Sequence, residues 1–137
     1  MIRDIVKDQF LLSQVSSDAT QEDLSIVNDL LDTIKKHQET CVGIAANMIG
    51  EPKKIMVVND QGHYLVLINP TIIKTDKNYY ETQEGCLCHE GTKPVKRYDK
   101  IKVAYYNQDF KKKIKTFTGL TSQIIQHEID HFQGVLI

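Results

Sequence analysis

The sequence predicts an α+β fold in which antiparallel β-sheets pack around a C-terminal helix, with a second helix near the N-terminus. Apolar residues recur at helical intervals near both ends of the chain. The middle instead contains short runs of β-branched and apolar residues separated by turn residues. Because these elements do not alternate as repeated β-α-β units, an antiparallel arrangement is the simpler prediction.

The N-terminal helix is predicted from about residue 20 to residue 37. Its apolar residues recur every three or four positions, which places them on one helical face. The polar residues Asp18 and Thr20 precede this run and can cap the first turn. The apolar positions are Leu24, Val27, Leu30, Leu31 and Ile34.

The middle of the chain predicts antiparallel strands joined by short turns. The residues at 60–62, Asp-Gln-Gly, are typical of a hairpin turn, and residues 107–109 form a second plausible hairpin loop. The predicted strands are residues 55–58, 64–68, 71–75, 100–106 and 112–117.

The last segment predicts a second helix. Thr118 can cap its start and Gly134 can end it. Its apolar positions are Leu120, Ile124, Ile125, Ile129 and Phe132.

The length and composition indicate a single domain with little net charge. A chain of 137 residues, of which 41% are hydrophobic, has the size of one ordinary domain, so residues 1–137 are predicted to form a single domain. The 17 Lys and Arg residues nearly balance the 18 Asp and Glu residues, for a formal charge of −1. The composition therefore gives no signal for binding nucleic acid or an anionic membrane.

No apolar stretch approaches the length of a signal peptide or a membrane span, so a cytoplasmic protein is expected. Three cysteines, Cys41, Cys86 and Cys88, are an odd number in such a chain. This argues against a disulfide framework and leaves a thiolate available as a metal ligand.

A His-Glu-x-x-His motif on the last helix indicates a metal site. His127 and His131 are about one helical turn apart, so both imidazoles can reach one divalent ion. Glu128 follows the first histidine, where a carboxylate can take a proton from water activated by the metal and later deliver it to a leaving amine. The alternative is that both histidines are surface or core-edge residues of an amphipathic helix.

A catalytic site of this kind needs a third protein ligand. The downstream position used by one class of metalloprotease is Ile137, so the ligand is expected upstream. Cys86 and Cys88 are the strongest candidates, and strand alternation points both to the same face without choosing between them. His89 is expected to face solvent, and Cys41 to pack against the sheet.

Three segments carry a resemblance to a known family. Residues 41–48 read Cys-Val-Gly-Ile-Ala-Ala-Asn-Met, residues 84–88 read Glu-Gly-Cys-Leu-Cys, and residues 126–131 read Gln-His-Glu-Ile-Asp-His. In this order they resemble the motifs of the peptide deformylases, which remove the formyl group from the initiator methionine of nascent bacterial chains. The resemblance covers most of the chain and implies a deformylase-like fold.

The resemblance assigns roles to the metal-site residues. It makes Cys86 the third ligand beside His127 and His131, and Glu128 the catalytic acid and base. It implies one divalent metal ion, with Fe²⁺ preferred in the cell and Zn²⁺, Ni²⁺ or Co²⁺ able to occupy the same site.

The resemblance also implies how the substrate is held. Leu87 would contribute a backbone N–H to the formyl oxygen, and the stretch around Val42 and Gly43 would pair with the substrate backbone as an added strand. The implied partner is an N-formylmethionyl peptide, with the enzyme associated with the ribosome.

Met48 is the main departure from the family pattern, because it stands where the family has a substrate-contacting glutamine. The glutamine amide donates a hydrogen bond to the developing oxyanion, and a thioether has no N–H to donate. Asn47 is adjacent but would face the other way on an extended segment. Cys41 replaces a glycine and Cys88 a serine of the family motifs.

These observations leave three hypotheses. The first is an active deformylase of a short, divergent type. The second is a deformylase-like paralogue that binds metal but has weak activity or acts on another small N-acyl amide, and Met48 supports it. The third is a binding or structural module that uses no metal chemistry, against which the presence of Glu128 argues.

Overall fold

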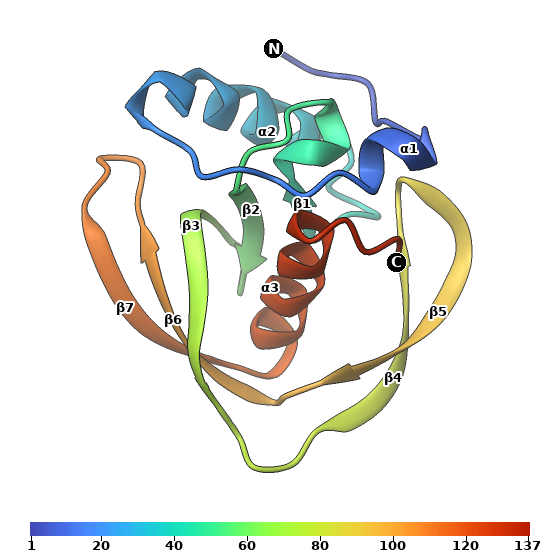
Figure 1. The fold of residues 1–137 in the computed structure, drawn as a ribbon, viewed down its shortest axis with the longest axis vertical. Helices are drawn as coiled ribbons and strands as arrows, with labels where there is room; N and C mark the ends of the chain where they lie inside the picture. The colour runs from blue at the N-terminus through green and yellow to red at the C-terminus, as the bar shows by residue number, and fades with distance from the viewer.

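The computed structural model describes residues 1–137 except for the side chain of His89, so the expectation for that side chain lies outside the described residues. The helical elements come first and last, with the strands between them (Figure 1). The helical elements are α1 (Gln9–Leu12), η1 (Gln21–Asp23), α2 (Leu24–Lys36), η2 (Ala46–Ile49) and α3 (Gly119–Phe132). The strands are β1 (Gly43–Ala45), β2 (Ile55–Asp60), β3 (His63–Thr75), β4 (Tyr80–Cys86), β5 (His89–Arg97), β6 (Lys100–Tyr106) and β7 (Lys112–Thr118).

The strands form two antiparallel sheets on either side of α3. One sheet has five strands in the order β1-β2-β3-β6-β7, and the other is the two-stranded pair β4-β5. Figure 1 shows α3 in the middle of the molecule, with β6 and β7 to its left and β4 and β5 to its right. The predicted α+β class, with antiparallel sheets around the C-terminal helix, is therefore confirmed.

Helix α2 confirms the predicted amphipathic helix, with a later start. Thr20 caps the short 3-10 turn η1, where its side chain accepts the Glu22 N–H, and the α-helix begins only at Leu24. The inward face is buried at Ile26, Val27, Leu30 and Ile34. This face packs on β1 and β2 and closes one side of the core.

The two predicted hairpins are present. Strands β2 and β3 meet at a tight turn in which Gln61 and Gly62 both have positive φ, at 53° and 94°. The runs predicted separately at 64–68 and 71–75 are one strand, because β3 continues through an irregularity between Ile68 and Thr71. Strands β6 and β7 pair along their full length, as predicted.

The β4-β5 hairpin and the short helix α1 were not predicted. Most side chains of β5 are exposed, and the strand includes Pro94, so the sequence there lacks apolar alternation. This hairpin matters for the site because β4 ends at Cys86.

Helix α3 carries the histidine motif. Thr118 has the extended backbone of an N-cap residue, but its side chain makes no capping hydrogen bond, so that part of the capping prediction is wrong. The helix ends at Phe132, and Gly134 follows with φ of 78°, which suits its predicted role as a terminator. In the described part of the chain, no helix is both long and apolar enough to span a membrane.

Candidate metal centre

Helix α3 directs both histidine rings of the motif to one point. The Nε2 atoms of His127 and His131 are 3.1 Å apart. Both side chains are buried, and their rings meet edge to face with centroids 4.8 Å apart. The four-residue spacing thus produces the convergence that the sequence predicted.

A cysteine sulfur approaches the same point from β4. The Cys86 Sγ atom is 3.4 Å from the Nε2 atom of His131. The Cys88 Sγ atom is 3.2 Å from that of Cys86, and both sulfurs lie within 4.8 Å of a ring nitrogen of His131. Strand alternation does not relate the two cysteines, because Cys86 is the last residue of β4 and Cys88 lies in the turn that follows.

This donor set fits a tetrahedral divalent ion. With bonds of about 2.0 Å to nitrogen and about 2.3 Å to sulfur, such an ion holds its ligand atoms about 3.3 to 3.6 Å apart. The separations of 3.1 Å between the His127 and His131 nitrogens and 3.4 Å between His131 and Cys86 are close to these values. Two imidazoles and a thiol are ligands that suit Fe²⁺ or Zn²⁺ over Mg²⁺ or Ca²⁺.

The thiol and the first imidazole both have shifted pKa values. The neighbouring Cys88 sulfur and burial raise the pKa of Cys86 to about 11. Burial by itself would lower the pKa of His127, but hydrogen bonds with Cys86 and Glu84 outweigh it and raise that pKa to about 10. Binding of a cation would require the loss of both protons, because thiolate and neutral imidazole are the forms that bind metal.

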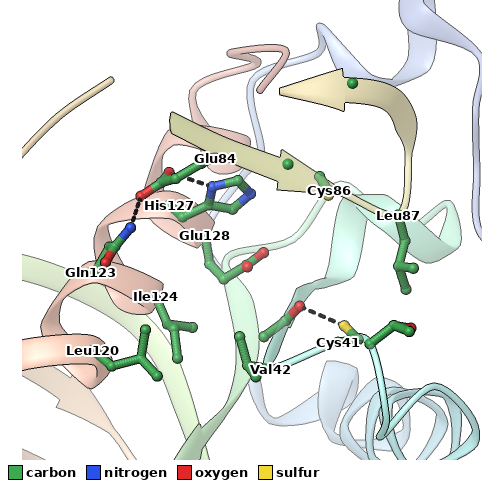
Figure 2. Close-up of a pocket in the computed structure, with 14 residues that line it drawn as sticks. Cys41, Val42, Glu84, Cys86, Leu87, Leu120, Gln123, Ile124, His127 and Glu128 are labelled. Atoms are coloured by element: carbon green, nitrogen blue, oxygen red, sulfur yellow. Dashed lines mark hydrogen bonds and ion pairs between the residues drawn. The ribbon is translucent and has the colours of Figure 1, made fainter. Parts of the chain in front are cut away.

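The buried acid Glu84 orients the His127 ring through the nitrogen that faces away from the proposed metal. The Glu84 carboxylate, at the end of β4, accepts a 2.7 Å hydrogen bond from Nδ1 of His127, which leaves Nε2 free for the metal (Figure 2). The Arg97 guanidinium donates to both Glu84 oxygens at 2.7 and 3.1 Å, and Gln123 donates at 2.8 Å. Burial would raise the pKa of Glu84, but these hydrogen bonds lower it to about 2.

Glu128, the acid of the motif, has a carboxylate oxygen that makes no hydrogen bond to the described residues. Its side chain is buried, and among the described residues its Oε1 atom has no hydrogen-bond partner. Burial raises the pKa of Glu128 to about 7, against the opposing charge of His127. A buried carboxylate that titrates near neutral pH can both accept and return a proton.

A pocket of about 380 Å³ opens onto this carboxylate. Figure 2 shows Glu128 beside His127, with the apolar side chains of Ile124, Val42 and Leu87 around the opening. The lining includes Cys41, Val42, Gly43, Glu84, Cys86, Leu87, Leu120, Gln123, Ile124, His127 and Glu128.

Most of the sequence-predicted site residues line this pocket, but His131 and Met48 do not. His131 lies behind the lining, in contact with His127 and Cys86. Val42, Gly43 and Leu87 line the pocket, whereas Met48 is fully buried and its sulfur accepts the Ala45 N–H at 3.4 Å.

Two neighbours of these residues differ from expectation. Cys41 is buried, as expected, but it also reaches the pocket, where its thiol donates to the Gly43 carbonyl at 3.0 Å. Asn47 lies on the 3-10 helix η2, not on an extended segment, and donates at 3.0 Å to the backbone carbonyl of His131.

The orienting residues Glu84 and Arg97 were not among the predicted site residues. Glu84 stands in the quoted Glu-Gly-Cys segment, so an acid two residues before a proposed ligand was an available signal. Arg97 comes from β5, and nothing in its local sequence marks it as buried. Its charge is matched by Glu84 and by Asp130, to which it donates at 2.8 Å.

Replacing Gly43 with alanine is expected to impair both the site and the fold. An added Cβ would lie 2.5 Å from Cγ2 of Ile124 and 2.9 Å from Oε2 of Glu128, so both side chains would have to move. We expect a loss of about 1–3 kcal/mol in the free energy of unfolding, measured by urea denaturation, together with a fall in kcat. Val42→Ala, at a side chain 45% exposed, is the matched control and should leave the stability nearly unchanged. Natural stability and activity in Gly43→Ala would contradict this close contact.

Comparison with known proteins places this site in a family. The sequence model of the polypeptide deformylases matches residues 2–137. The chain belongs to the polypeptide deformylase family. A relative from Clostridium beijerinckii, a peptide deformylase, is 47% identical over 137 residues, which is 100% of both chains. The peptide deformylase of Dictyoglomus turgidum is 35% identical over 116 residues, covering 82% of this chain and 72% of that protein.

Solved deformylase structures share the fold. The peptide deformylase of Ehrlichia chaffeensis matches with a TM-score of 0.88 and 27% identity, covering 99% of this chain and 86% of that one. The actinonin-bound class I type b enzyme of Acinetobacter baumannii matches at 0.88 with 24% identity, covering 99% and 95%, and shows likeness of fold. Deformylases are hydrolases that use a single divalent metal, and the donor atoms of Cys86, Cys88 and His131, with Nε2 of His127 beside that of His131, form a possible Cys/His site for one.

Proposed function

We propose that this protein hydrolyses the N-formyl group from the initiator methionine of nascent peptides and releases formate. The observation that carries the proposal is the convergence of the Cys86 sulfur and the two histidine Nε2 atoms beside a pocket. Glu128 lies at the same pocket with an oxygen that is free to exchange a proton. The 47% identical deformylase relative favours this function over that of a weakly active paralogue.

We assign the metal to Cys86, His127 and His131, and Fe²⁺ is the ion proposed for the cell, with Zn²⁺, Ni²⁺ or Co²⁺ as substitutes. When bound, the ion would act as a Lewis acid on the formyl carbonyl and lower the pKa of water in the site. Glu84 supports this role, because its hydrogen bond to Nδ1 fixes the tautomer of His127.

Glu128 would move the protons of the reaction. Its pKa near 7 suits a group that takes a proton from the attacking water and then gives it to the departing amine. The backbone N–H of Leu87 would donate to the formyl oxygen as negative charge develops there. The products are formate and a peptide with a free N-terminus.

The pocket would hold the first residues of the peptide. Val42 and Gly43 line one side, where their backbone could pair with an extended peptide. Val42, Leu87, Leu120 and Ile124 provide apolar contact for a methionine side chain. We further propose that the protein acts in the cytoplasm, on chains that include those still attached to the ribosome.

The experiment that tests the function compares the natural chain with Met48→Gln. Both proteins are purified without oxygen, their bound metal is quantified, and formate release from a formyl-Met peptide is measured. We expect metal at unit stoichiometry and formate release in the natural chain. Met48→Gln should raise kcat, by up to about 10²-fold, because it restores an amide donor at the position where the deformylase motif has its glutamine.

Two results would contradict the proposal. Bound metal with negligible formate release, restored only by the glutamine, would identify the weakly active paralogue. Absence of tightly bound metal from the natural chain would instead support a binding module.

A further inference from the structure

Cys88 is a buried thiol that the proposed reaction does not use. It lies in the turn between β4 and β5, and its side chain is only 2% exposed. It is not among the residues that line the pocket, whereas Cys86 and Leu87 are. Cys88 therefore contacts the Cys86 sulfur without lining the pocket itself.

The distance between the two sulfurs identifies the kind of contact. At 3.2 Å, the Sγ atoms of Cys86 and Cys88 are too far apart for a disulfide, whose sulfurs are about 2.05 Å apart. They are also closer than the roughly 3.8 Å expected for two thiolates bound to one tetrahedral ion. A hydrogen bond from one thiol to the other sulfur accounts for the separation.

A bound ion decides which sulfur donates. Without the ion, either thiol can donate its proton to the hydrogen bond between the two sulfurs. Once Cys86 holds a cation it has lost its proton, so only Cys88 can donate. We propose that Cys88 is a positioning residue of the metal site, whose S–H donates a hydrogen bond to the ligand sulfur of Cys86. This inference rests on the metal site proposed above.

The hydrogen bond should strengthen metal binding. A donor stabilises a charged acceptor about twice as well as a neutral one, so the contact is stronger with the ion present than without it. Changes to such outer residues of metal sites typically alter affinity 10- to 100-fold. The donor also withdraws electron density from the Cys86 sulfur, which raises the energy of charge transfer from sulfur to metal.

The test uses Co²⁺ as a spectroscopic probe in the natural chain, Cys88→Ala and Cys88→Ser, all kept reduced. We expect Cys88→Ala to bind Co²⁺ about tenfold more weakly, by competition with a chelator, and its sulfur-to-cobalt band to move to longer wavelength. Cys88→Ser keeps an O–H donor and should remain close to the natural chain in both measurements.

Two further variants separate the hydrogen bond from packing. Cys88→Val lacks a donor but fills a similar volume, so it should reproduce the alanine result even if alanine leaves a destabilising cavity. Cys41→Ala removes another buried thiol near the site, whose S–H donates to the Gly43 carbonyl and not to Cys86. It should leave the cobalt band at its natural wavelength.

Other outcomes overturn the inference. An unchanged affinity and band in both Cys88→Ala and Cys88→Val would make Cys88 a packing residue. Loss of about half the band intensity in all three Cys88 variants would make Cys88 a ligand. A natural chain that binds no Co²⁺ would remove the proposed function together with this inference. A natural chain that binds Co²⁺ and releases formate, with no effect of Cys88, would remove the inference alone.

Discussion

Replacing Glu128 with alanine is expected to lower kcat for formate release by about 10²–10⁴-fold while leaving the metal bound. The loss follows from removing the group that exchanges protons with water and with the leaving amine. The three proposed ligand atoms, the Cys86 sulfur and the two Nε2 atoms, would be unaffected, since none of them is hydrogen-bonded to Glu128.

The measurement combines single-turnover formate release with elemental analysis of the purified variant. Glu128→Gln is the matched control for shape, because the amide is similar in size but cannot accept the proton. Both variants should lose activity to a similar extent. Metal loss in either one, or activity within tenfold of the natural chain, would contradict the assigned role.

Arg97→Met should produce the largest loss of stability, about 3–5 kcal/mol in the free energy of unfolding. The guanidinium is nearly inaccessible and donates to both oxygens of Glu84. Methionine fills part of the space but, among the described side chains, leaves the buried carboxylate with His127 and Gln123 alone as partners. Urea denaturation of the metal-free proteins measures the difference.

The same variant should change how stability depends on pH. The pKa of Glu84 is lowered from 4.5 to about 2 in the folded protein. The resulting stabilisation is therefore fully present above about pH 4.5 and is lost as the pH falls towards 2. Arg97→Met should show a shallower loss over this range, whereas the exposed neighbour Lys96→Met should follow the natural curve. Parallel curves for Arg97→Met and the natural chain would exclude this contribution.

The sequence predicted the elements whose apolar residues follow a clear period. Helices α2 and α3 each bury one apolar face, and β2, β3 and β6 carry runs or alternating sets of buried apolar residues, so these elements are visible in the sequence. The three-residue strand β1 was not predicted. The β4-β5 hairpin was missed because most of its side chains are exposed and its pairing gives no apolar alternation. The short 3-10 helix η2 was also missed. The prediction that Asn47 faces away from Met48 assumed an extended segment, so it does not apply to this helix.

The site was predictable where it depends on helical spacing. Helix α3 carries His127, Glu128 and His131, so their spacing in the sequence fixes the relative positions of their side chains. Only the family resemblance chose Cys86 over Cys88 as the ligand. The structure shows why the residues alone could not choose: the two sulfurs are in contact, and both lie close to His131. Arg97 could not be assigned, since its partners Glu84 and Asp130 are 13 and 33 residues away along the chain.

The β4-β5 hairpin contributes Glu84, Cys86 and Arg97 to the centre, yet it hydrogen-bonds to no strand of the larger sheet. Its attachment to α3 therefore depends on side chains: the hydrogen bonds from His127 and Gln123 to Glu84, the ion pair of Arg97 with Asp130, and the ion that we propose Cys86 shares with the histidines. Chelation should loosen this hairpin before any other element. Amide hydrogen exchange at β4 and β5 would then accelerate while the protection of β2 and β3 persists.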